Sequence, residues 1–296
     1  MRIFHEKQEV PMKKSTLLTI GMTGYSFYNA YKTAQIQQRT KTGQTVLITG
    51  ASSGIGKDLA YEFAKHGFNV ILSSRRKDKL QEIAKDLEKN YPIRTYVFCA
   101  DLSSANGARQ LYEDITKAGI QVDQLVNNAG AGVAAQLIHV SPETLEELIN
   151  LNIVSMTMLC RLFGKDMAER KTGKILNVAS MSSFVANPGL NLYGPSKSYD
   201  YFLSETLYGE LMDHGVHVSV LCPGPVKTNW NAHAGRKDSV FCMNSKKVAA
   251  EAYTGLQAEK LVIIPGTLFQ CARTAVRFLP DQCTIRFLKA FQKRLK

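Results

Sequence analysis

Residues 45–56 read TVLITGASSGIG, and this stretch decides the fold class. Its first five residues are apolar or β-branched, which is typical of a buried parallel strand. A glycine-rich turn follows, and residues 57–66 carry apolar side chains at helical spacing. Glycines let a backbone approach a ligand closely, and a helix N-terminus offers free N–H groups to phosphates. The stretch therefore predicts a phosphate-binding turn; a tight strand-to-helix turn without a ligand is the alternative.

The rhythm of strand and helix continues to residue 265. Further strands are expected at 68–73, 96–100, 124–127, 174–178, 216–221 and 260–264, and helices at 77–90, 105–118, 142–170, 191–213 and 246–257. This alternation predicts an α/β fold, a doubly wound parallel sheet of the Rossmann type. Ligands of such sheets bind at the carboxyl ends of the strands. We expect one catalytic domain at residues 43–265, with appendages at 1–42 and 266–296.

Composition and charge exclude several classes of protein. The 296 residues are 45% hydrophobic and 21% charged, unlike a disordered or collagen-like chain. The net charge of +12 is concentrated at the two ends, which indicates contact with an anionic membrane surface. No nucleic-acid-binding motif is present, so no nucleic-acid partner is expected. The six cysteines lack metal-ligand spacing, which predicts no metal site and reduced thiols, as in the cytoplasm.

The two appendages each leave two interpretations open. Residues 15–31 carry no charge, but they are fewer than the roughly 20 apolar residues that a spanning helix needs. They form either a loosely packed leader or a weak membrane anchor, and both Met1 and Met12 are candidate start residues. At the other end, Pro280 predicts two short basic amphipathic helices. These either bind a membrane surface or pack on the body or on another subunit.

The end of the second strand bears on the choice of cofactor. An NAD-binding site usually places Asp or Glu there to bind the ribose. Here residues 73–76 read Ser-Ser-Arg-Arg, without a carboxylate. An arginine can form a charge-assisted contact with a 2′-phosphate. The sequence therefore favours NADP, with Arg75 as the contact; arginines that are merely solvated are the alternative.

Tyr193 and Lys197 are four residues apart and share one face of a predicted helix. A free tyrosine has a pKa near ~10. A neighbouring ammonium favours the phenolate, which brings the hydroxyl closer to the working range of a general acid or base. Ser180 directly follows a predicted strand and can donate a hydrogen bond to a carbonyl oxygen in the same cleft. Together these residues predict carbonyl–alcohol chemistry.

These motifs, in this order, resemble the short-chain dehydrogenase/reductase family over residues 43–265, and especially its microbial ketone reductases and its steroid and long-chain 3-oxoacyl reductases. The resemblance implies a catalytic tetrad of Asn152, Ser180, Tyr193 and Lys197, with Asn152 distorting its helix and connecting Lys197 to solvent. The cofactor contacts that it implies, with those argued above, are Gly50, Ser52, Ser53, Gly54, Ile55, Gly56, Arg75, Asp101, Leu102, Asn128, Ala129, Gly130, Tyr193, Lys197, Pro223, Gly224, Val226 and Thr228.

The resemblance implies a hydride transfer from NADPH to a ketone. Residues 229–245 have apolar character and are expected to form a lid over a bulky, lipid-like substrate; an ordinary surface loop is the alternative. A dehydrogenase of a small polar hydroxy compound and a cofactor-binding regulatory protein without turnover are the competing functions. Homo-oligomers are usual in the family, so one is expected here.

Overall fold

The structure is a computed structural model that describes residues 43–235, 237 and 241–294, with side chains to residue 291 at the C-terminal end. The predictions for the leader, residues 1–42, lie outside this range. Residues 40–296 belong to one compact unit. Within the described residues, no helix is both long and apolar enough to cross a lipid bilayer.

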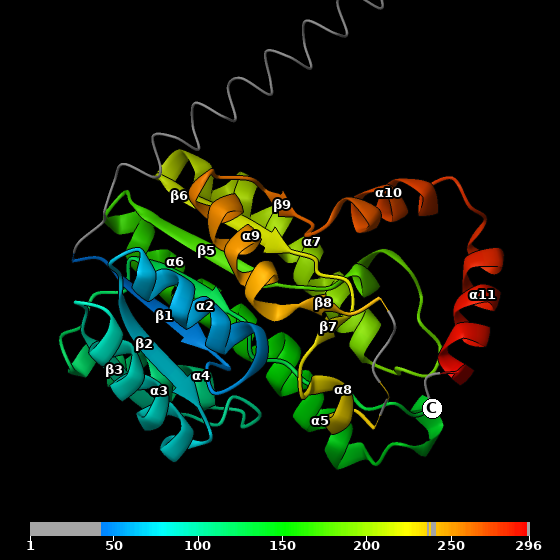
Figure 1. Ribbon diagram of the computed structural model, residues 1–296, viewed down its shortest axis with the longest axis horizontal. Coiled ribbons are helices and arrows are strands. Elements are labelled where there is room, and N and C mark those ends of the chain that lie inside the picture. Colours follow the sequence, from blue (N-terminus) through cyan, green and yellow to red (C-terminus); the bar gives the residue numbers. More distant parts are fainter. Residues whose placement is uncertain (1–42, 236, 238–240, 295–296) are drawn as a thin grey trace, which may run out of the picture. The chain divides into compact units, whose positions relative to one another are not determined.

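One parallel sheet of seven strands lies at the centre, in the order β3-β2-β1-β4-β5-β6-β9 (Figure 1). The strand β1 lies between β2 and β4, so the winding direction reverses there and creates the switch point at which such sheets bind ligands. The predicted doubly wound α/β fold is therefore confirmed. The strands are β1 (Thr45–Thr49), β2 (Asn69–Ser74), β3 (Thr95–Cys99), β4 (Gln124–Asn127), β5 (Gly173–Val178), β6 (Val216–Leu221) and β9 (Val262–Ile263).

Helices cover both faces of this sheet. Side chains of β1 alternate between two cores: Val46 and Ile48 face one cluster and Leu47 faces the other. The first core joins the sheet to α2, α3 and α9, and the second joins it to α4, α6 and α7. The helices are α2 (Gly54–Lys65), α3 (Lys77–Asn90), α4 (Gly107–Lys117), α5 (Pro142–Ile149), α6 (Ser155–Glu169), α7 (Tyr193–Leu211), α8 (Trp230–His233) and α9 (Ser245–Gln257).

The helix predicted over residues 142–170 is present from Pro142 to Glu169, but one π-helical turn interrupts its α-helical pattern. It starts as expected, because the Ser141 hydroxyl accepts a hydrogen bond from the Thr144 N–H at 3.3 Å. A π-helical turn, η2 (Asn150–Val154), then separates α5 from α6. Such turns insert an extra residue into a helix and often mark functional sites. The distortion that was expected around Asn152 is therefore present.

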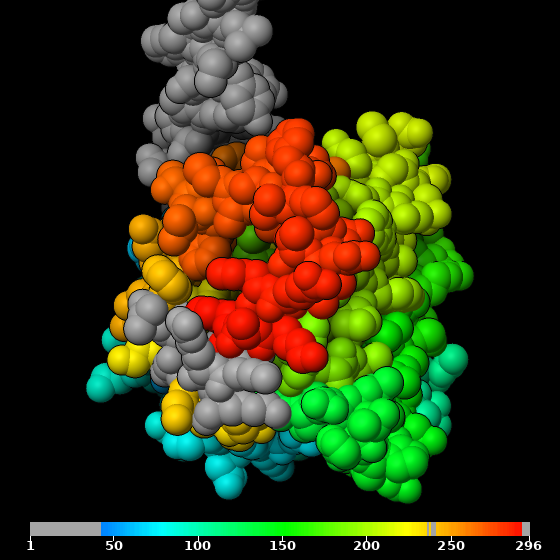
Figure 2. Space-filling model, turned by 90° about the vertical axis from the view of Figure 1, so that its right-hand side faces the viewer, coloured from blue at the N-terminus to red at the C-terminus, as the bar shows by residue number. Residues whose placement is uncertain are grey.

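Two further helices follow the sheet, and Pro280 separates them as predicted. They are α10 (Thr267–Val276) and α11 (Asp281–Arg294). Arg273 of α10 lies 5.0 Å from the ring centroid of Phe184 and donates to the Tyr201 hydroxyl at 2.8 Å. These contacts fasten α10 to the body. In Figure 2, α10 (orange) and α11 (red) lie on one face of the molecule.

Candidate active site

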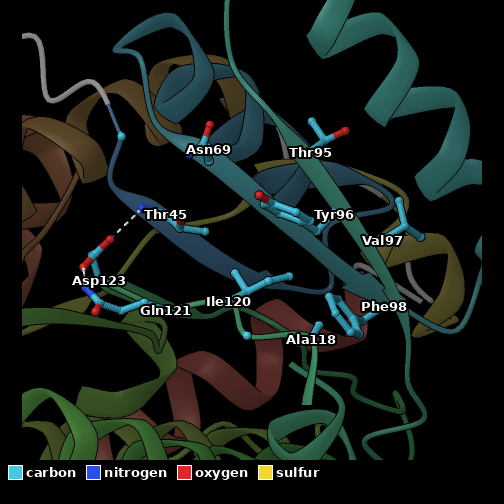
Figure 3. Close-up of a pocket in the computed structure, with 12 residues that line it drawn as sticks. Thr45, Asn69, Thr95, Tyr96, Val97, Phe98, Ala118, Ile120, Gln121 and Asp123 are labelled. Carbon is cyan, nitrogen blue, oxygen red and sulfur yellow. Dashed lines mark hydrogen bonds between the residues drawn. The ribbon is translucent and has the colours of Figure 1, made fainter. Parts of the chain in front are cut away.

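The predicted site residues gather at one edge of the sheet, because they follow the carboxyl ends of parallel strands. A cavity of about 690 Å³ lies at the opposite edge (Figure 3). It is lined by residues at the starts of β1, β2 and β3, and there the Asp123 carboxylate accepts a hydrogen bond from the Thr45 N–H at 2.8 Å. That cavity is remote from the predicted chemistry, so the site is built from the carboxyl-end loops.

The glycine-rich turn between β1 and α2 is shaped for close approach. Gly50 and Gly54 have φ angles of +66° and +57°, which residues with a side chain rarely adopt. A Cβ at Gly56 would overlap the Asn128 amide and lie 2.5 Å from the Gly50 carbonyl oxygen. Ser53 makes no side-chain hydrogen bond to the start of α2. The first N–H groups of this helix therefore point at a cradle that fits the pyrophosphate of a dinucleotide.

The loop after β4 is locked to this turn. The backbone N–H groups of Asn128 and Ala129 each donate to the Thr49 hydroxyl at 3.0 Å. The Asn128 amide donates to the Thr49 carbonyl oxygen at 2.9 Å. Asn127 instead points into the interior and donates to Asn177 at 2.9 Å. The structure thus brings the predicted residues Asn128 and Ala129 to the phosphate turn, while Asn127 has a structural position.

An arginine reaches the phosphate turn from the end of β2, but it is Arg76. Its Nη2 atom lies 2.9 Å from the Ser52 hydroxyl and 2.7 Å from the Ser53 hydroxyl. Arg75, the predicted contact, is exposed and lies close enough to Asp101 to affect it electrostatically. Hydrogen bonds from Ser103, and then the charge of Arg75, hold the pKa of the Asp101 carboxyl below its usual range. Sequence reasoning named Arg76 only beside Arg75, so its contact with the turn was missed.

Tyr193 is the first residue of α7, and Lys197 lies one turn further on. The Lys197 ammonium is 5.9 Å from the centroid of the Tyr193 ring, and the lysine is only 5% exposed. The ammonium donates to the Val178 carbonyl oxygen at 2.8 Å and to Asp200 at 2.7 Å. The predicted pair therefore exists, with a buried carboxylate that the sequence analysis did not single out.

Asn152, in the π-helical turn, ties the loop after β4 to α7. Its side chain accepts a hydrogen bond from the Ala131 N–H at 3.0 Å and donates to the Ala131 carbonyl oxygen at 2.9 Å. It also donates to the Ser196 hydroxyl at 3.1 Å. A Cβ at Gly130 would lie 3.4 Å from both the Asn152 Oδ1 and the Lys197 Nζ atoms. The polar ends of Asn152 and Lys197 therefore lie close together, beside Gly130.

Ser180 lies at the start of a short helix, η3 (Met181–Phe184), directly after β5. Its hydroxyl oxygen accepts a hydrogen bond from the Ser182 N–H at 3.1 Å, which orients the side chain. The η3 segment is bonded to α7, because the Ser183 hydroxyl donates to the Lys197 carbonyl oxygen at 2.7 Å. The structure thus carries Ser180 on a segment that is tied to the helix of Tyr193 and Lys197.

The segment after β6 borders the same edge. Thr228 packs on the phosphate turn, since a Cβ at Gly54 would lie 3.2 Å from its methyl group. Trp230, in α8, packs against Tyr193 with their ring centroids 4.6 Å apart. The described part of the expected lid, residues 229–245, contains α8 and β8 (Met243–Asn244), and β8 pairs with β7 (Val226–Lys227). Of the remaining predicted cofactor contacts, Leu102 and Val226 are buried and Ile55 is partly buried.

Comparisons with known proteins bear on the family to which the chain belongs. The sequence model of the family described as short chain dehydrogenase matches residues 44–239. The chain is 34% identical to mouse 17-beta-hydroxysteroid dehydrogenase type 3 over 80% of this chain and 81% of that protein. It is 33% identical to human very-long-chain 3-oxoacyl-CoA reductase, over 63% of this chain and 60% of that protein.

A solved structure gives the same result for the fold. A short-chain dehydrogenase from Sphingobium yanoikuyae in complex with NADPH superposes with a TM-score of 0.72 at 28% identity. The match covers 80% of this chain and 96% of that structure.

Proposed function

Because the chain belongs to the short chain dehydrogenase family, whose members are NAD(P)-dependent oxidoreductases of carbonyl and hydroxyl groups, we propose that it is an NADPH-dependent reductase of a bulky, apolar ketone. The observation that carries this proposal is that Lys197 lies beside Tyr193 and close to Gly130, in the loop that is hydrogen-bonded to the start of the glycine-rich turn. A general acid and its charged partner thus lie at the edge of the sheet that binds the cofactor.

The chemistry divides between the cofactor and the chain. A bound nicotinamide dinucleotide supplies the hydride. Ser180 donates a hydrogen bond to the carbonyl oxygen of the substrate and orients it, and Tyr193 donates a proton to the same oxygen. Lys197 uses two of its three N–H donors on Val178 and Asp200, so its third N–H serves a ribose hydroxyl. Asn152 connects Lys197 to solvent through the loop after β4.

Three observations support NADPH as the preferred cofactor. The end of β2 carries serines and arginines, without a carboxylate to bind an unphosphorylated ribose. Arg76 is held over the phosphate turn by Ser52 and Ser53, and Arg75 is beside it. The similar protein from Sphingobium yanoikuyae binds NADPH. We assign Arg75 and Arg76 together to the 2′-phosphate.

The substrate class rests on the apolar surroundings of Tyr193. Trp230 covers one side of its ring, and Phe269 of α10 packs on Gly224, where a Cβ would overlap its ring. The two curated relatives are named for a steroid and for a very-long-chain acyl group, both large and apolar. A small polar hydroxy compound would leave this aromatic surface uncovered.

The test is NADPH oxidation by the full chain against a graded set of ketones. The set runs from short keto acids through 3-oxoacyl thioesters of increasing length to ring ketones, with NADH in parallel. We expect kcat/KM to rise with apolar size and NADPH to be preferred by at least tenfold. A preference for small polar ketones would favour the competing dehydrogenase, and good NADPH binding without any turnover would favour a regulatory protein.

We also propose that α10 and α11 touch an anionic membrane surface. Phe278 and Phe287 are 83% and 70% exposed, and the exposed Arg277, Arg286 and Lys289 lie among them. Apolar side chains interleaved with cations are typical of helices that lie in a membrane interface. In this proposal the protein is cytoplasmic and the contact is peripheral.

Sedimentation with vesicles tests the membrane contact. We expect the protein to bind vesicles that contain phosphatidylserine and to dissociate in high salt. The double change Phe278→Ser and Phe287→Ser removes this binding, whereas Met212→Ser, at an exposed methionine after α7, preserves it. Equal binding by both variants would argue against this surface.

A further inference from the structure

The Lys197 ammonium forms an ion pair with a carboxylate in the interior of the protein. Its Nζ atom lies 2.7 Å from Asp200 Oδ2, and the two side chains are only 6% and 2% exposed. The other carboxylate oxygen, Oδ1, is buried and has no hydrogen-bond partner among the described residues. Lys197 is therefore the principal group that compensates this buried charge. A carboxylate held in this way has to be explained, because burying a charge is costly.

We propose that Asp200 is a positioning residue for the reduction, which fixes the Lys197 ammonium beside Tyr193 and compensates its charge. The inference rests on the proposed function and adds a residue to it. A carboxylate beside an ammonium makes the ammonium hold its proton more tightly, so Lys197 stays charged next to the tyrosine. A reductase needs a protonated tyrosine, since the hydroxyl is the proton donor.

The other groups around the pair do not replace Asp200. Cys222, directly after β6, and Cys160 of α6 both lie close enough to respond to its charge. Burial raises the pKa of each of these thiols to about 12, so both remain neutral at physiological pH. Arg273 of α10 and Glu205 of α7 both bond to the Tyr201 hydroxyl, and their charges act on Cys222.

The electrostatics of the pair agree with this role. Burial acts to lower the pKa of the Lys197 ammonium, but Asp200, and then Tyr193, act in the opposite direction, and the net shift is upward. Burial raises the pKa of the Asp200 carboxyl, and Lys197 opposes this shift. Both net shifts are upward, so Lys197 and Asp200 each bind their proton more tightly than the free side chains do.

The pH profile of ketone reduction tests the proposal. We expect Asp200→Asn to move the alkaline limb of kcat/KM to lower pH by about one unit, because an opposite charge within hydrogen-bond distance shifts a titration by at least that much. Asp200→Glu restores the limb toward the wild-type position. The control Asp213→Asn removes a charge from an exposed site after the same helix and leaves the limb unchanged. A folded Asp200→Asn protein with the wild-type limb would overturn the proposal.

A second measurement does not depend on activity. Thermal melting of Asp200→Asn, of Lys197→Met and of the double variant forms a mutant cycle. We expect each single change to lower Tm, since it leaves one buried charge unpaired, and the double change to melt above Asp200→Asn. Additive losses would show that the two charges do not compensate each other. If the wild-type protein reduced no ketone, the proposed function would be refuted. The mutant cycle would still show whether Lys197 and Asp200 compensate each other's charge.

Discussion

The indole ring of Trp230 packs on the phenol ring of Tyr193, with the ring centroids 4.6 Å apart and the planes tilted by 48°. Gly132 lies against both rings, since a Cβ there would come within 2.7 Å of the indole and 3.2 Å of the phenol ring. The backbone N–H of Trp230 donates to the Thr228 hydroxyl at 3.2 Å, which fixes the start of α8. Trp230, which lies in the expected lid, therefore gives Tyr193, the predicted proton donor, an apolar neighbour.

This packing predicts that Trp230→Ala weakens the binding of large ketones. The substrate loses an aromatic surface, and aromatic contacts contribute about 1 kcal/mol beyond the burial of area. We expect KM for a long-chain or ring ketone to rise about tenfold, which is about 1.4 kcal/mol, and KM for a short ketone to change little. Steady-state kinetics with both ketones measure this difference. Phe202→Ala, at an exposed position of α7, is the matched control; equal changes for both ketones would exclude Trp230 from the substrate surface.

Arg76 predicts how the protein discriminates between NADPH and NADH. Its guanidinium is held by Ser52 and Ser53, so little side-chain entropy is lost when it binds a phosphate. We expect Arg76→Ala to raise Kd for NADPH at least tenfold and to leave Kd for NADH almost unchanged. Titration of cofactor fluorescence measures both constants. Lys85→Ala, an exposed cation on α3, should change neither, and equal weakening of both cofactors would contradict the assignment.

The close packing around Gly56 predicts that a single added methyl group weakens cofactor binding. In Gly56→Ala the new methyl group overlaps the Asn128 amide and the Gly50 carbonyl, so the phosphate turn has to shift. We expect NADPH binding to fall at least tenfold while circular dichroism stays that of the folded protein. Gly209→Ala is the matched control, because its Cβ has open space in the exposed part of α7. That change should raise stability by about 1 kcal/mol and leave binding as it is.

Much of the fold could be predicted because it depends on local patterns. The strands are short apolar runs such as 45–49, and their order along the chain fixes a doubly wound sheet. Ser141 and Pro142 start α5 as their positions predict. The π-helical turn could not be predicted from spacing, since it accompanies hydrogen bonds between Asn152 and Ala131, 21 residues apart.

The parts of the site that depend on local spacing could also be predicted from the sequence. Spacing alone brings Tyr193 and Lys197 to one face of α7. The i, i+3 spacing of Lys197 and Asp200 was also visible, but their burial was not, and burial is what makes the pair informative. Arg76 and Ser53 are 23 residues apart, and the turn that follows β2 decides which of two adjacent arginines reaches the serines.

The central claim is that Tyr193 is the proton donor of a reductase, and Tyr193→Phe tests it most directly. The substitution removes one hydroxyl and keeps the ring that packs on Trp230. We measure NADPH oxidation with the best ketone of the graded set, together with NADPH binding by fluorescence. The account predicts that turnover falls at least a hundredfold, as for loss of a general acid, with the Kd for NADPH within about twofold of the wild type. Turnover close to the wild-type value in this variant would contradict the account.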